Sequence, residues 1–90
     1  MRKVRINVKG RVQGVGFRYT TKMVADQLNV HGLAVNNSDG SVTIEATGDE
    51  KAIQDFIKKV KESPSPAGNV NTIDVTDDET IEVRDQFLAR

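Results

Sequence analysis

The chain has 90 residues, no cysteine, and 13 basic and 13 acidic residues, so it makes one small domain (residues 1–90) with no formal net charge. The missing thiols exclude disulfides and thiolate chemistry, while the balanced charge and only three Phe and one Tyr argue against a nucleic-acid surface. No apolar run follows Met1, so neither a signal peptide nor a membrane span is expected and the predicted location is the cytoplasm.

The first predicted element is a strand over residues 4–9, where apolar and polar side chains alternate. Gly10 to Arg18 follow, and we call this the glycine segment because it holds three glycines. Glycines allow tight turns and let backbone N–H groups approach a ligand closely. Because a helical pattern comes next, the helix N-terminus would add partial positive charge, and Arg18 would supply a planar fork that fits a phosphate. These features predict an anion-binding loop.

The residues after Gly16 exclude two well-known phosphate-binding motifs. A Walker A loop ends in Gly-Lys-Ser or Gly-Lys-Thr, but Phe17 and Arg18 stand at that point. A dinucleotide fingerprint needs a third glycine three residues after Gly16, where Tyr19 stands. The segment is therefore either a cradle for a single phosphate group without Mg²⁺ chemistry or only a tight turn.

A helix is predicted after the glycine segment, because apolar residues recur at helical spacing from Thr21 to Leu28, and Gly32 is its expected stop. On this interpretation His31, the only histidine, lies at the far end of the helix, roughly 15–20 Å from the glycine segment. We therefore expect His31 to be a helix-terminal cation or a surface residue, and not a catalytic base.

A β-hairpin is predicted next, with strands over residues 33–36 and 42–47. Between them, Gly40 can take a positive φ and Asp39 can hydrogen-bond the nearby backbone, which predicts a tight turn.

A second helix is predicted from Asp49, which can cap its N-terminus, to the Pro64 region, where proline ends it. Its apolar stripe has i, i+3, i+4, i+7 spacing and is expected to be core; its members are Ile53, Phe56, Ile57 and Val60.

Two further strands are predicted, one marked by Ile73 and Val75, the other by Ile81 and Val83 with Phe87 as its furthest extent. The acidic run over residues 74–82 is expected to be a solvated strand edge, because neighbouring carboxylates point in different directions and make a poor metal site.

The order of elements predicts an α+β, ferredoxin-like sandwich: β-α-β-β-α-β plus a terminal strand, with two helices on one face of a mainly antiparallel sheet. The core is expected between the helices and the apolar strand positions, among them Val4, Ile6, Val8, Val42 and Ile44.

Two segments resemble the motifs of the acylphosphatase family. The glycine segment, Gly-Arg-Val-Gln-Gly-Val-Gly-Phe-Arg, is similar to the family signature, and Gly32 to Val42 is similar to its second motif. The resemblance covers nearly the whole chain and implies the same ferredoxin-like fold. Several positions depart from the family pattern: Leu33 stands where a Trp is usual, Val35 where a Lys or Arg is usual, and Asn29 where a Gly is common, and Arg90 stands at the end where many members have an aromatic residue.

The resemblance implies that the chain hydrolyses the carboxyl–phosphate bond of acyl phosphates without metal or cofactor. Inorganic phosphate would be its product and inhibitor, and a monomer is expected. Arg18 and Asn36 would be the catalytic residues, the second orienting the water. The phosphate would be held by the backbone cradle and the arginine, that is, by Gln13, Gly14, Val15, Gly16, Phe17 and Arg18.

Asn37 competes with Asn36 for the water-orienting role. Asn36 lies four residues before Gly40, which is the family spacing, whereas Asn37 lies three before it. Successive strand side chains point to opposite faces, so only one of the two can face the glycine segment, and Asn36 is preferred.

Two other functional classes share this fold. One is a non-catalytic acylphosphatase-like module that binds a phosphate-bearing metabolite or a partner protein. The other is an RNA-recognition domain, but the strands over residues 4–9 and 42–47 lack the aromatic side chains on which such domains stack bases.

Overall fold

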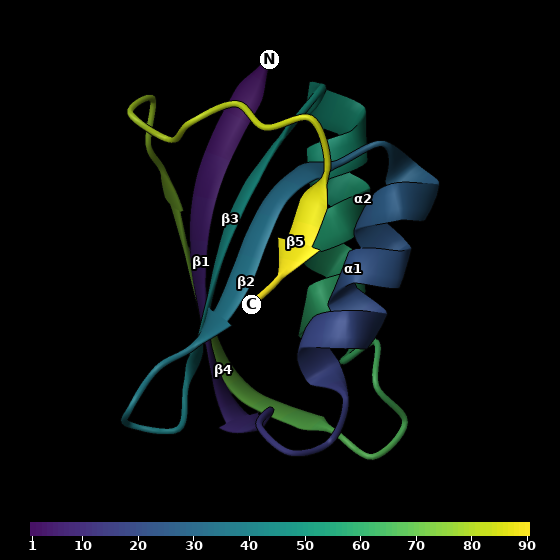
Figure 1. The fold of residues 1–90 in the computed structure, drawn as a ribbon, viewed down its shortest axis with the longest axis vertical. Coiled ribbons are helices and arrows are strands. Elements are labelled where there is room, and N and C mark those ends of the chain that lie inside the picture. The colour runs from purple at the N-terminus through teal and green to yellow at the C-terminus, as the bar shows by residue number, and fades with distance from the viewer.

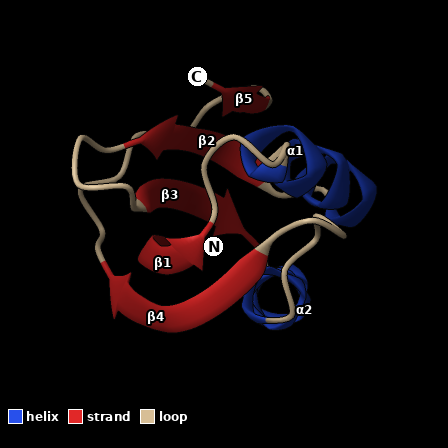
Figure 2. Cartoon of the chain, turned by 90° about the horizontal axis from the view of Figure 1, so that it is seen from below, coloured by secondary structure: helices blue, strands red, loops and turns tan.

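The computed structural model describes residues 1–90. Its elements in chain order are β1 (Arg2–Arg11), α1 (Phe17–Leu28), β2 (His31–Asn36), β3 (Val42–Gly48), α2 (Glu50–Lys61), β4 (Asn69–Asp77) and β5 (Phe87–Ala89). The strands form one sheet in the order β4-β1-β3-β2-β5, and both helices cover the same face of it (Figures 1 and 2). The predicted ferredoxin-like sandwich with an added strand is confirmed.

The sheet is antiparallel except at one edge. β1 pairs with β3 and β4, β2 returns beside β3 as the predicted hairpin, and β5 alone runs parallel to its neighbour β2. β5 also packs beside α1 (Figure 2). Residues 89–90 therefore lie next to the beginning of the first helix and near the glycine segment.

The core lies between the sheet and the helices, as the alternation of the strands predicts. Val4, Ile6 and Val8 of β1 are fully buried, and the second helix buries Phe56 against Phe87 of β5 with ring centroids 5.9 Å apart. Burial of an aliphatic or aromatic side chain of this size contributes about 1.5–3 kcal/mol, so these layers stabilise the scaffold of the site. Neither helix combines the length and the apolar character that a membrane crossing requires.

The first helix ends earlier than the sequence analysis predicts. It stops at Leu28, and Asn29 caps it in the left-handed conformation with φ 60°, which Asn tolerates better than most residues. Gly32 lies instead within β2, where an ideal Cβ would stand 1.8 Å from the carbonyl oxygen of Glu45. The prediction that Gly32 stops the helix is wrong, because the close approach of β3 is what requires glycine there.

The expected position of His31 is also wrong. His31 is the first residue of β2, and its Nδ1 lies 2.9 Å from the carbonyl oxygen of Arg84. The side chain therefore contacts the segment that leads to β5, and the residue does not lie at a helix terminus.

The fifth strand is shorter and later than predicted. Residues 78–86 form no strand, although Ile81 is buried, and only Phe87–Ala89 pair with β2. Alternating apolar residues at Ile81 and Val83 resemble a strand locally, but no neighbouring edge pairs with them.

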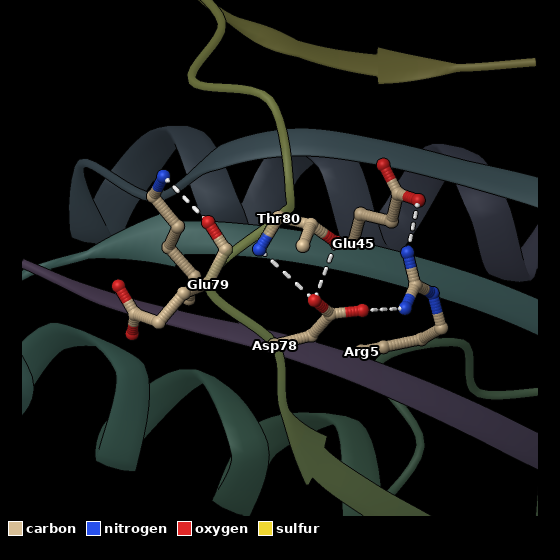
Figure 3. Close-up of polar contacts among 6 residues, drawn as sticks. Arg5, Glu45, Asp78, Glu79 and Thr80 are labelled. Atoms are coloured by element: carbon tan, nitrogen blue, oxygen red, sulfur yellow. Dashed lines mark hydrogen bonds and ion pairs between the residues drawn. The ribbon is translucent and has the colours of Figure 1, made fainter.

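Polar contacts hold residues 78–80, at the start of this segment, to the outer face of the sheet (Figure 3). Arg5 donates hydrogen bonds to Glu45 (3.0 Å) and to Asp78, and Asp78 also accepts from the backbone N–H of Thr80 (2.9 Å) and from its hydroxyl (2.5 Å). The acidic run is thus only partly a solvated edge, because Asp78 fixes the chain as it leaves β4. These contacts lie at the opposite end of β1 from the glycine segment.

Candidate functional site

The sign of φ alternates along the loop between β1 and α1. Gly14 and Gly16 have left-handed φ values of 73° and 76°, and Val15 between them has a negative φ. Successive residues of alternating handedness turn their N–H groups toward one concavity, which is the geometry of an anion-binding nest. No protein atom lies within 4 Å of an ideal Cβ at either glycine, so the φ values, and not crowding, require glycine at these positions.

The N–H groups of this loop donate to no protein acceptor. No hydrogen bond from the backbone N–H of Gly14, Val15 or Gly16 occurs in the structure. The carbonyl of Val15 points the other way and accepts a 2.6 Å hydrogen bond from the buried hydroxyl of Ser65. The loop is therefore anchored through its carbonyl side, while its donors remain available to a ligand.

The first turn of α1 adds further backbone N–H donors beside the glycine loop. Gly16 is the N-cap residue of the helix and no side chain caps it, so the first helical N–H groups keep their capacity to donate. Phe17, the first helical residue, is buried in the core and fixes the direction in which the helix begins. A helix N-terminus in this orientation carries partial positive charge toward an anion.

Arg18 lies on the same cavity as the glycines. This cavity has a volume of about 200 Å³, and its lining comprises Val12, Gly14, Gly16, Phe17, Arg18, Tyr19 and Ala89. One guanidinium nitrogen of Arg18, Nη1, donates to the main-chain oxygen of Arg90, just after β5. A guanidinium has five N–H donors, so this contact positions the arginine and leaves other donors free.

Gln13 joins the loop to the β2–β3 turn. Its side-chain Nε2 lies 2.8 Å from the carbonyl oxygen of Asn37 and 2.9 Å from that of Ser41. The side chain of Gln13 is thus engaged within the protein, so only its backbone remains for the cradle role that the resemblance implies.

The two asparagines lie on opposite faces of the sheet. Asn36 pairs across the hairpin with the buried Val42, so it belongs to the face that the helices cover. Its side chain is exposed and makes no hydrogen bond within the protein, and it does not line the cavity. Asn37 donates instead to the hydroxyls of Ser41 (2.9 Å) and Thr43 (2.7 Å). The turn around Gly40 forms as predicted, with Asp39 accepting from the N–H of Ser41 at 2.9 Å.

Three residues that support or line the site were not predicted, because no motif in the sequence marks them. Ser65 supports the loop from the segment after α2, Ala89 approaches it from β5, and Arg90 approaches it from just after β5. Ser65 lies 50 residues from Val15 and Arg90 lies 72 residues from Arg18, and no motif joins them. The proline-rich composition around Ser65 indicated only a helix stop.

The fold and this loop together define a small α+β domain of ferredoxin-like topology with a backbone nest between its first strand and first helix. The family model for acylphosphatase matches residues 4–88. An acylphosphatase of Enterococcus faecalis is 58% identical over 87 residues, which are 97% of this chain and 96% of the relative. This chain belongs to the acylphosphatase family.

Solved structures agree with that assignment. The crystal structure of the Bacillus subtilis acylphosphatase superposes with a TM-score of 0.94 at 43% identity and covers 100% of this chain and 99% of that one. Full-length HypF in its phosphate- and nucleotide-bound form matches at 35% identity with a TM-score of 0.83, covering 99% of this chain but only 12% of that protein.

Proposed function

We propose that this chain hydrolyses acyl phosphates to a carboxylate and inorganic phosphate. The observation that carries the proposal is the combination of Arg18 with the free N–H groups of Gly14–Gly16 on one cavity, in a chain of the acylphosphatase family. An acyl phosphate presents a phosphoryl dianion, and backbone donors with a guanidinium are the groups that bind such an anion well.

In the proposed reaction a water oxygen attacks phosphorus while the bond from phosphorus to the acyl oxygen breaks. The carboxylate leaves with the bonding electrons, the phosphoryl group gains the hydroxyl, and a phosphoryl oxygen takes the remaining proton. The carboxylate is a good leaving group, so positioning and fixed dipoles supply most of what the transition state needs.

Arg18 and the cradle would hold the phosphoryl oxygens, and Asn36 would orient the water. Its amide combines two donors and one acceptor without changing protonation state, as that role requires. Support for Asn36 comes from its place on the helix-covered face and from its unused hydrogen-bonding capacity. Asn37 lacks both features, because its amide donors already bind Ser41 and Thr43.

Phosphate release from acetyl phosphate and benzoyl phosphate, each measured with and without a chelator, tests the proposal. Turnover of both substrates that survives the chelator is the expected result. No turnover above the uncatalysed rate would favour the alternative, a non-catalytic module that binds a phosphate-bearing metabolite or a partner protein. A monomeric state and a cytoplasmic location also stay predictions, which light scattering and cell fractionation can check.

A further inference from the structure

One side of the cavity is apolar, and the proposed chemistry leaves it unused. The cradle glycines and Arg18 lie on the same cavity as Tyr19 and Ala89. The cavity has a volume of about 200 Å³ and opens to solvent, so a phosphoryl group held by the cradle glycines and Arg18 would place the attached acyl group at the mouth, beside Tyr19.

Tyr19 is the large apolar side chain at the mouth. It is 63% exposed, whereas the neighbouring Phe17 of the same helical turn is 1% exposed and belongs to the core. No hydrogen bond within the protein holds the hydroxyl of Tyr19, and most of the side chain is exposed, so the ring is accessible to a ligand in the cavity.

A second exposed apolar side chain continues this surface. Met23 follows Tyr19 by four residues in α1, which places the two side chains side by side on the helix, and it is 45% exposed. Few large apolar residues of the chain are exposed; they are Met1, Tyr19, Met23, Val75 and Val83. Two of these residues, Tyr19 and Met23, are neighbours on α1 next to the candidate site.

We propose that Tyr19, with Met23 behind it, forms a subsite for the acyl group and favours acyl phosphates whose acyl group is flat and apolar, such as an aryl group, over acetyl phosphate. This inference rests on the proposed function, because the phosphoryl group must occupy the cradle for the acyl group to reach Tyr19. An aromatic ring offers a rigid face to another ring, and the thioether of methionine adapts to the shape beside it.

The contact between Tyr19 and the acyl group would be present both in the bound substrate and in the transition state. An interaction of equal strength in the bound substrate and in the transition state lowers KM and leaves kcat almost unchanged. Aromatic pairs of this kind change affinity by a factor of about 2 to 10.

Steady-state kinetics with benzoyl phosphate and acetyl phosphate test the subsite. Tyr19→Ala should raise the KM for benzoyl phosphate about fivefold with little change in kcat, and should alter both constants for acetyl phosphate less than about twofold. Tyr19→Phe should behave as the wild type, because it keeps the ring. Val83→Ala, which removes an exposed apolar side chain outside the site, is the matched control and should change neither substrate.

Tyrosine fluorescence gives an independent reading, because Tyr19 is the only tyrosine and the chain has no tryptophan. Benzylphosphonate, which carries a phenyl ring and is not hydrolysed, should change the emission on titration, and methylphosphonate should change it much less.

The outcomes separate the two proposals. If the wild type hydrolyses neither substrate, the proposed function fails. If it hydrolyses both, but Tyr19→Ala affects both equally or neither, the subsite is wrong while the function stands. Equal fluorescence responses to the two phosphonates would overturn the subsite as well.

Discussion

Gln13 ties the glycine segment to Asn37: the side-chain Nε2 of Gln13 lies 2.8 Å from the carbonyl oxygen of Asn37, in the turn that follows β2. The same nitrogen lies 2.9 Å from the carbonyl oxygen of Ser41 on the other side of that turn. A single amide group thus fixes the distance between the cradle and the strand end that carries Asn36.

Replacing Gln13 by Ala should lower kcat about tenfold, because small displacements of a positioned group are costly in rate. The inhibition constant of inorganic phosphate should change little, since the cradle donors are backbone groups. Steady-state kinetics with phosphate as inhibitor measure both effects. Gln27→Ala, an exposed glutamine of α1 without a side-chain hydrogen bond, is the control. A kcat for Gln13→Ala equal to that of the control would contradict the positioning role.

Removing the guanidinium in Arg18→Ala should lower the rate by about 10² to 10³ or more, because a charged partner of the phosphoryl group is lost. Arg18→Lys should also be poor, since an ammonium cannot make the bidentate contact. Thermal unfolding should change only slightly, because the lost contact to the main chain of Arg90 is a single hydrogen bond near the surface. More than about a tenth of the wild-type rate in Arg18→Ala would show that the transition state does not depend on this charge.

Inorganic phosphate should bind in the cradle and inhibit competitively, because it is the product and the N–H donors of Gly14–Gly16 are free. An NMR titration should shift the backbone amide signals of residues 13–18 more than those elsewhere in the chain. Non-competitive inhibition, or amide shifts spread evenly over the sheet, would place the anion elsewhere.

The two neighbouring asparagines should separate activity from stability. Asn36→Ala should lower kcat sharply and leave unfolding and phosphate affinity almost unchanged, since the side chain of Asn36 makes no hydrogen bond within the protein. Asn37→Ala should have the milder effect on kcat but should lower the free energy of unfolding by about 1–2 kcal/mol, because two hydroxyl partners lose their donor. Urea unfolding and kinetics on both variants check this. The reverse pattern would mean that the water is oriented from the other face of the sheet.

Asp78 should make the fold more stable at neutral than at acid pH. Hydrogen bonds from Thr80, and then from Arg5, lower the pKa of Asp78 to about 2, compared with ~3.9 in an unfolded chain. A depressed carboxyl pKa stabilises the folded state above the unfolded value, and this stabilisation is lost as the pH falls through the folded value. Asp78→Asn should therefore unfold more readily than the wild type at pH 7, and the difference should shrink toward pH 2. A difference that is independent of pH would show that the charge of Asp78 is not involved.

Local patterns in the sequence determined most of the architecture. The alternation in β1 and β3, the stripe of Ile53, Phe56 and Val60 and the cap at Asp49 are all found as predicted. These signals are short in range, because a strand or helix must bury one face whatever its neighbours are. The left-handed glycines of the segment after β1 are local in the same way, since only their own φ values require glycine.

Tertiary structure decided the features that depend on distant partners. Gly32 is needed because β3 passes close by, and Ile81 and Val83 form no strand because their segment leads from β4 at one edge of the sheet to β5 at the other and pairs with neither. The wall of the cavity from Ala89 and the placement of Arg18 by Arg90 depend on β5 joining β2 in parallel. Such contacts join residues far apart in sequence, and nothing in either segment alone specifies its partner, so only the packed fold determines them.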